Sequence, residues 1–200
     1  MSGTPHREDT PRTLVAGVGN VFLGDDGFGV ECVRALREHQ LPPAVEAVDF
    51  GVRGVHLAYQ LLDGYDTLIL VDATARGGAP GSVYLIELGT PGAEASQGAV
   101  LDGHHMSPDA VLALLDTLCS GTGAKPPRRT LVIGCEPLSV EEGIGLSGPV
   151  AAAVPDAVRW VLDLVQGDET GAARRLVESD DPGTARRETP APTTTRTHGP

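Results

Sequence analysis

Residues 66–72 read DTLILVD, and this stretch is the most continuous aliphatic run in the chain. Leu68 to Val71 are all aliphatic, so neighbouring side chains on opposite faces of a strand would both be apolar. A strand of this kind has to be covered on both faces, which is typical of the centre of a parallel sheet. The stretch therefore predicts an α/β fold in which helices pack on both sides of the sheet.

Apolar runs and helix-like periodicities alternate on either side of this stretch. Further strands are expected at residues 13–19, 44–50, 82–88 and 130–136. Helices are expected at residues 27–39, 55–62, 107–118 and 149–165, the last of them bent at Pro155. This alternation predicts an α/β three-layer sandwich, in which a twisted, mainly parallel five-stranded sheet carries helices on both faces.

The two ends of the chain differ in composition from the part between them. Residues 1–12 are polar and contain Pro5 and Pro11, and apolar residues become rare from Gly167 onward. Such segments bury too little apolar surface to offset the entropy lost on ordering. We therefore expect a disordered N-terminal extension (1–12), one domain (13–166) and a disordered C-terminal tail (167–200).

Composition excludes several classes of protein. The formal net charge of −12 argues against a nucleic-acid partner, which requires clustered Lys and Arg. The three cysteines, Cys32, Cys119 and Cys135, lie far apart in apolar stretches and indicate neither a disulfide framework nor a thiolate zinc site. No apolar run reaches the roughly 18 residues of a membrane span, and residues 1–12 lack the apolar core of a signal peptide. A cytoplasmic protein without membrane contact is expected.

Acidic residues and histidines occur where open α/β sheets bind ligands, after the carboxyl ends of the strands. Asp25 and Asp26 follow the first strand, Asp72 ends the central one, and His104 and His105 precede a helix. Carboxylate and imidazole ligands together suit nickel or zinc. Structural roles compete with this interpretation, because one of Asp25 and Asp26 is expected to cap the following helix and Asp72 could accept a structural hydrogen bond.

Other catalytic schemes find less support. The dinucleotide-binding glycine pattern fails because Phe22 stands where its third glycine belongs. The sequence contains neither a GxxxxGK[ST] phosphate loop nor a GxSxG nucleophile elbow. Cys135 is the cysteine nearest to a functional strand end, and its apolar neighbours argue against a lowered pKa.

Taken in order, the sequence motifs resemble those of the hydrogenase maturation proteases. They are GVGNVFLGDDGFGV (17–30), DFGVRG (49–54), LILVDA (68–73), APG (79–81), GHHMSP (103–108), GCEP (134–137) and GIGLSGPV (143–150). The match extends from residue 13 to about residue 165. The resemblance implies a metal-dependent endopeptidase that removes the C-terminal extension of the nickel-loaded large-subunit precursor of a nickel–iron hydrogenase.

The resemblance also assigns residues and partners. It makes Asp26, Asp72 and His104 the metal-facing catalytic residues, with His105 as a substitute for His104 and with nickel supplied by the precursor. Many members of the family carry glutamate at the position of Asp26, and aspartate reaches about one C–C bond less far. The hydrogenase precursor is the expected partner, and a monomer is expected. A non-catalytic chaperone that binds metal or precursor, and a peptidase for a different precursor, are the alternatives.

Overall fold

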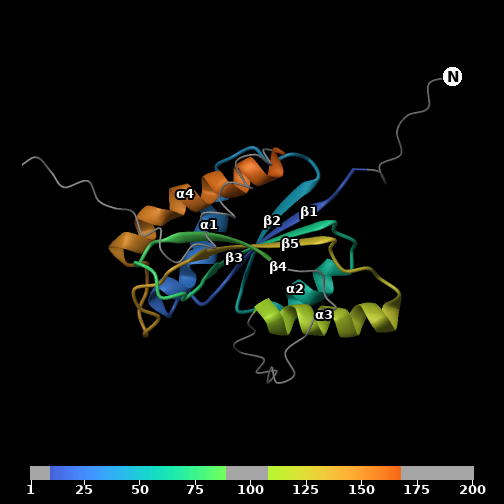
Figure 1. The fold of residues 1–200 in the computed structure, drawn as a ribbon, viewed down its shortest axis with the longest axis horizontal. Coiled ribbons are helices and arrows are strands. Elements are labelled where there is room, and N and C mark those ends of the chain that lie inside the picture. Colours follow the sequence, from blue (N-terminus) through green and yellow to red (C-terminus); the bar gives the residue numbers. More distant parts are fainter. Residues whose placement is uncertain (1–9, 89–107, 168–200) are drawn as a thin grey trace, which may run out of the picture.

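A computed structural model describes residues 10–88 and 108–167, which contain one five-stranded sheet in the order β2-β1-β3-β5-β4 (Figure 1). The strands are β1 (Thr13–Val18), β2 (Val45–Gly51), β3 (Thr67–Ala73), β4 (Val83–Leu88) and β5 (Arg129–Cys135). Strand β1 pairs in parallel with β2 and β3, and β3 pairs in parallel with β5. Among the strands of residues 10–88 and 108–167, only the pairing of β4 with β5 is antiparallel. The sheet is thus mainly parallel, and the aliphatic stretch forms its central strand, as predicted.

Helices cover both faces of the sheet (Figure 1). They are α1 (Phe28–Leu36), α2 (Gly54–Leu61), α3 (Pro108–Thr122) and α4 (Gly148–Val165). Helices α1 and α4 pack together on one face, and α2 and α3 pack together on the other. The three-layer sandwich is therefore confirmed. Within residues 10–88 and 108–167, no helix combines the length and the apolarity that crossing a membrane requires.

Helix α3 continues beyond its predicted end near Leu118. The apolar periodicity stops there, but the hydroxyl of Thr122 donates to the carbonyl of Leu118 within the last turn. Gly123 then adopts a φ of 75°, and its N–H donates to the carbonyl of Cys119 at 2.9 Å. A glycine in this left-handed conformation is a common helix stop, so the helix ends at the glycine rather than at the last apolar residue.

The burial of β3 on both faces accounts for its continuous aliphatic sequence. Leu68 and Leu70 belong to the core under α2 and α3, whereas Ile69 and Val71 belong to the core under α1 and α4. All four side chains are almost fully buried. Because side chains alternate along a strand, Asp72 continues the row of Leu68 and Leu70, at the carboxyl end of β3.

Two glycines allow α1 to lie directly against the sheet. A Cβ on Gly29 would lie 2.0 Å from the carbonyl oxygen of Val71 and 2.5 Å from that of Val18. A Cβ on Gly17 would lie 2.3 Å from the carbonyl oxygen of Gly29. Any side chain at these positions would push the helix off β1 and β3. This close packing also brings the segment before α1 to the end of β3.

Candidate active site

The predicted acidic residues Asp26 and Asp72 meet at the carboxyl edge of the sheet. Strand β1 leads into α1 on one face, whereas the helices that flank β3 in the chain, α2 and α3, lie on the opposite face. When the connections of two adjacent parallel strands run to opposite faces of a sheet, a crevice forms at the carboxyl ends of these strands. Ligands of such folds bind in this crevice. Asp26 follows β1 and Asp72 lies near the end of β3, so the crevice has a carboxylate from each strand.

Asp26 lies in a short 3₁₀ helix (Gly24–Gly27) that the sequence patterns did not predict. Its carboxylate accepts the backbone N–H of Asn20 at 2.6 Å, which closes the loop after β1. The loop folds back so tightly that a Cβ on Gly19 would lie 1.8 Å from the carbonyl oxygen of Asp26, and Gly19 has a φ of 120°. The loop geometry therefore holds this partly exposed carboxylate in place.

The environment of Asp72 opposes its ionisation. The pKa of Asp72 is raised to about 7, first by burial and then by the nearby negative charge of Asp26, against the opposite effect of the backbone N–H of Ala73. Two carboxylates that share a poorly hydrated site resist carrying two charges together. A bound cation would relieve both effects, so the pair is suited to binding a positively charged group.

The structure tests only part of the predicted metal-facing set. It brings Asp26 and Asp72 together, but His104 and its substitute His105 lie outside the described residues. Within the described ranges, no three His, Cys, Asp or Glu side chains form a group able to hold a metal ion. The two aspartates by themselves therefore do not make up the predicted metal-facing set of three residues.

The prediction that Asp25 or Asp26 caps the following helix is wrong. The N-cap position of α1 is Gly27, and no side chain caps the helix. Both carboxylates are engaged elsewhere, Asp26 by its own loop and Asp25 by a distant one. The sequence signal for a cap was present, but tertiary hydrogen bonds compete successfully for both side chains.

Asp25 is buried and binds the loop between β5 and α4. Its carboxylate accepts the backbone N–H groups of Leu138 (2.8 Å), Ser139 (3.1 Å) and Ser147 (2.6 Å), and also the Ser147 hydroxyl (2.9 Å). Burial acts to raise the pKa of Asp25, but these hydrogen bonds outweigh it and leave the pKa below its ordinary value. Asp25 thus fixes the turn that carries the neighbouring Asp26.

Glu136 has a similar role on the other side of Asp72. Its buried carboxylate accepts the backbone N–H groups of Arg76 (2.8 Å) and Gly77 (3.1 Å) and the hydroxyl of Tyr84 (2.9 Å). Burial acts to raise its pKa, but these donors hold it below the ordinary value. Glu136 therefore anchors the loop that follows Asp72. Sequence reasoning missed both anchors, although Glu136 belongs to the GCEP motif.

The cysteines are free and buried. Burial raises the pKa of Cys135 to about 12, with smaller contributions from the charges of Asp25 and Glu136. A thiol with this pKa is almost entirely protonated near neutral pH and is a poor nucleophile. The prediction that Cys135 does not have a lowered pKa is confirmed.

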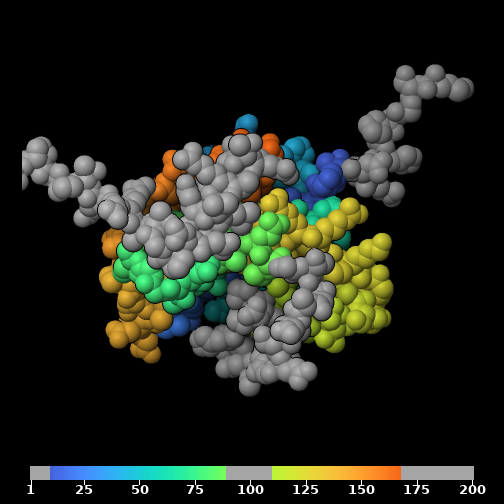
Figure 2. All heavy atoms as spheres, viewed as in Figure 1, coloured from blue at the N-terminus to red at the C-terminus, as the bar shows by residue number. Residues whose placement is uncertain are grey.

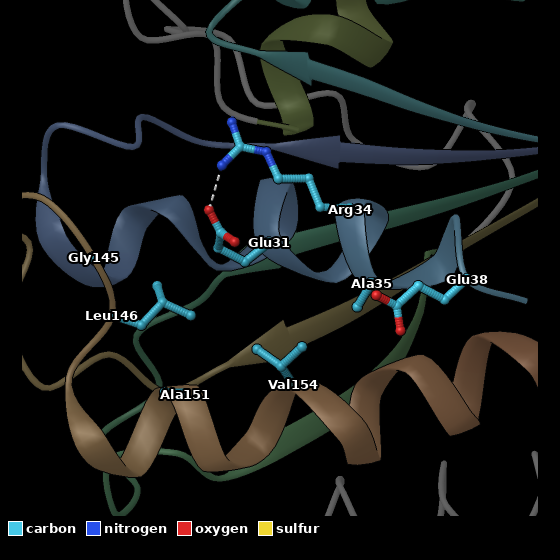
Figure 3. Close-up of a pocket in the computed structure, with 8 residues that line it drawn as sticks. All are labelled: Glu31, Arg34, Ala35, Glu38, Gly145, Leu146, Ala151 and Val154. Carbon is cyan, nitrogen blue, oxygen red and sulfur yellow. Dashed lines mark hydrogen bonds and ion pairs between the residues drawn. The ribbon is translucent and has the colours of Figure 1, made fainter.

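A groove of about 540 Å³ lies between α1 and α4 (Figure 3). It is lined by Glu31, Arg34, Ala35, Glu38, Gly145, Leu146, Ala151 and Val154. Glu31 and Arg34 form an ion pair at 2.6 Å, which Figure 3 shows along α1. Neither Asp26 nor Asp72 lines this groove, so its location does not coincide with the acidic pair.

The fold and the acidic pair define an α/β protein with a carboxylate site at the switch point of its sheet. Residues 30–164 match the family described as hydrogenase maturation protease. The "hydrogenase expression/formation protein HoxM" of Azotobacter vinelandii is 34% identical over 185 residues, with 91% of this chain and 83% of the relative covered. The "hydrogenase 2 maturation protease" of Escherichia coli is 36% identical, with 76% of this chain and 88% of the relative covered.

Solved structures agree with these relatives. The hydrogenase maturating endopeptidase HybD from E. coli superposes with a TM-score of 0.62 at 31% identity, covering 78% of this chain and 93% of HybD. The chain therefore belongs to the hydrogenase maturation protease family and is a peptidase. The resemblance that the ordered motifs indicated is confirmed.

Proposed function

We propose that this protein is the cytoplasmic endopeptidase that removes the C-terminal extension from the nickel-loaded large-subunit precursor of a nickel–iron hydrogenase. The observation that carries the proposal is the meeting of Asp26 and Asp72 at the switch point of the sheet, in a chain of this family. The pair is poorly stabilised as two free charges, which favours a substrate that brings a cation. We further propose that the enzyme acts as a monomer.

The roles of the residues follow from this substrate. Asp26 and Asp72 bind the nickel ion of the precursor and thereby position the peptide bond that is to be cut. Nickel bound to the substrate supplies Lewis acidity toward the carbonyl oxygen or toward a water molecule. One of the two carboxylates takes the proton of the attacking water. Asp25 and Glu136 hold the two loops in register so that the carboxylates keep their geometry.

His104 is the proposed third ligand. Helix α3 is followed by β5, which begins at the amino edge of the sheet, so α3 runs from the carboxyl edge toward the amino edge (Figure 1). His104 precedes the first residue of α3 by four positions in the sequence. This connectivity supports a donor from residues 89–107 at the edge where Asp26 and Asp72 lie. His105 is the alternative donor.

The test uses purified precursor that still carries its nickel and its extension. Intact-mass measurement after incubation should report the loss of the extension. Asp72→Asn and Asp26→Asn should each slow cleavage by at least about 100-fold, since each removes a charged ligand and a candidate base. Nickel-free precursor should remain uncut. A precursor mass that stays unchanged with wild-type protein, despite binding, would instead identify a chaperone.

The histidines provide a matched pair of variants. His104→Ala should abolish cleavage, whereas His105→Ala should retain most of it, because a single imidazole completes the proposed ligand set. Nickel bound in the enzyme–precursor complex can be monitored by its absorption bands in the same samples. Equal loss of activity in both variants would contradict the assignment of His104.

A further inference from the structure

An apolar surface lies beside the acidic pair, on two loops that are far apart in the sequence. In the described part of the chain seven large apolar side chains are well exposed, and four of them lie on these loops. They are Phe22 (64% exposed), Leu138 (59%), Val140 (49%) and Ile144 (85%). We call this set the apolar patch. Exposing such side chains to water is unfavourable, so a gathering of them beside a reaction site marks a contact surface.

Backbone hydrogen bonds join the two loops into one surface. Gly143 donates to the carbonyl of Phe22 at 2.9 Å, and Gly24 donates to the carbonyl of Gly143 at 3.0 Å. The N–H of Asp25 donates to the carbonyl of Ser139 at 3.1 Å. In Figure 2 the orange atoms of the β5–α4 loop reach the surface close to blue atoms from the N-terminal part of the chain. The patch is therefore held in shape before any partner arrives.

Hydrogen bonds of Asn20 connect the patch to the acidic pair. The side-chain oxygen of Asn20 accepts the N–H of Phe22 at 3.0 Å, while the N–H of Asn20 donates to Asp26 at 2.6 Å. Phe22 and Asp26 thus belong to the same closed loop. A polypeptide bound at Asp26 therefore has Phe22 within the same short loop as a neighbouring contact surface.

The charge beside the patch restricts its partner. Glu141 and Glu142 are exposed and directly precede Gly143 and Ile144. The whole chain carries a net charge of −12. An apolar segment accompanied by Lys or Arg would bury the patch and also meet this acidic border, whereas an acidic segment would be repelled.

On these grounds we propose that the apolar patch is the docking surface for the part of the hydrogenase precursor next to its scissile bond, and that this part is apolar with basic residues alongside. The inference rests on the proposed function and identifies how the same site selects its substrate. Docking contributes binding that is separate from the chemistry at Asp26 and Asp72. Changes in the patch should therefore alter KM far more than kcat.

The experiment measures cleavage at a series of precursor concentrations. Ile144→Ser should raise KM about tenfold and Phe22→Ser/Ile144→Ser about 100-fold, as expected for lost apolar burial, with kcat falling less than about threefold. Tyr59→Ser is the matched control, because Tyr59 is 57% exposed but lies on α2 outside the patch. A double variant with wild-type KM, or a control that raises KM equally, would overturn the proposal.

Two further measurements separate this proposal from its alternatives. Precursor binding to immobilised protein should weaken in the double variant, whether or not wild-type protein cuts the precursor. The binding measurement therefore tests docking on the apolar patch separately from the proposed peptidase function. Raising the salt concentration should weaken binding by wild-type protein but much less by Glu141→Gln/Glu142→Gln. A wild-type homodimer that dissociates in the double variant would show that the patch binds a second copy of this chain, and would overturn the proposal.

Discussion

Asp25 accepts two hydrogen bonds from Ser147, one from its backbone N–H at 2.6 Å and one from its hydroxyl at 2.9 Å, although 122 positions separate the two residues. Ser147 is the N-cap residue of α4. The contact therefore fixes the beginning of α4 to the turn that precedes α1. One buried carboxylate thereby joins the first and last helices of the described fold, next to the acidic pair.

Replacing Asp25 by alanine should destabilise the protein strongly. Its carboxylate serves three backbone N–H groups and one hydroxyl in a buried position, and the variant would leave these donors without their acceptor. The free energy of unfolding should fall by at least about 3 kcal/mol. Denaturant titration measures this change. Asp156→Ala is the control, since it removes a half-exposed ion pair with Arg159 and should cost less than about 1 kcal/mol.

Gly29→Ala should prevent α1 from packing against the sheet. The added methyl group would lie 2.0 Å from the carbonyl oxygen of Val71, a backbone atom that cannot move aside cheaply. We expect a loss of at least about 3 kcal/mol or a failure to fold. Gly121→Ala introduces the same group within α3 at a position where no described atom beyond the helix's own backbone lies within 4 Å, and it should stabilise the protein by roughly 0.5–1 kcal/mol. Similar melting temperatures for both variants would contradict this account.

The sheet could be predicted from local patterns, which also placed Asp25, Asp26 and Asp72 at strand ends, whereas the choice of Asp26 over Asp25 came from the family resemblance. The aliphatic run Leu68 to Val71 requires cover on both faces, and Asp72 follows it directly. Asp26 follows the glycine-rich end of the first strand. In parallel sheets such strand ends share one edge, so a one-dimensional pattern was enough to place the two residues at the same edge.

The positioning residues could not be predicted in the same way. Asp25 has its partners more than 110 positions away, and Glu136 has partners about 50 to 60 positions away. The local sequence predicts that Asp25 caps a helix. The tertiary structure shows that its carboxylate instead accepts hydrogen bonds from the loop between β5 and α4. The one signal was indirect: the segments that contain Leu138, Ser139 and Ser147 belong to, or adjoin, the last motifs of the family resemblance.

The thiols should be unreactive in the folded protein. Burial raises the pKa of Cys32, Cys119 and Cys135, so few thiolates exist near neutral pH and reagents cannot reach them. A disulfide-exchange reagent at pH 8 should detect no rapidly reacting thiol in native protein and three in denaturant. Cys135→Ala should also retain precursor cleavage. A rapid reaction in the native state that removes activity would point to cysteine chemistry instead.

Asp72 should make the folded protein less stable as pH rises toward 7. Its pKa is about 7 in the folded protein, against an ordinary value of 3.8, so between these values the folded chain keeps a proton that the unfolded chain has lost. The free energy of unfolding therefore decreases with rising pH, by up to about 1.4 kcal/mol per pH unit from this group. The stabilising effect of the proton is present in full below about pH 4 and is lost above pH 7.

Asp72→Asn removes this dependence, because the amide cannot ionise. At pH 8 the variant should be more stable than wild-type protein, by on the order of 3 kcal/mol, and the difference should shrink toward pH 5. Asp26→Asn should give a smaller change in the same direction, since it removes a charge that raises the pKa of Asp72 while burial remains. Denaturant titrations at pH 5 and pH 8 measure both variants, with Asp156→Asn as a control substitution at a half-exposed carboxylate on α4. If Asp72→Asn follows the wild-type pH dependence, the carboxyl is not held in a poorly hydrated site beside Asp26, and the reason for expecting it to attract a cation disappears with it.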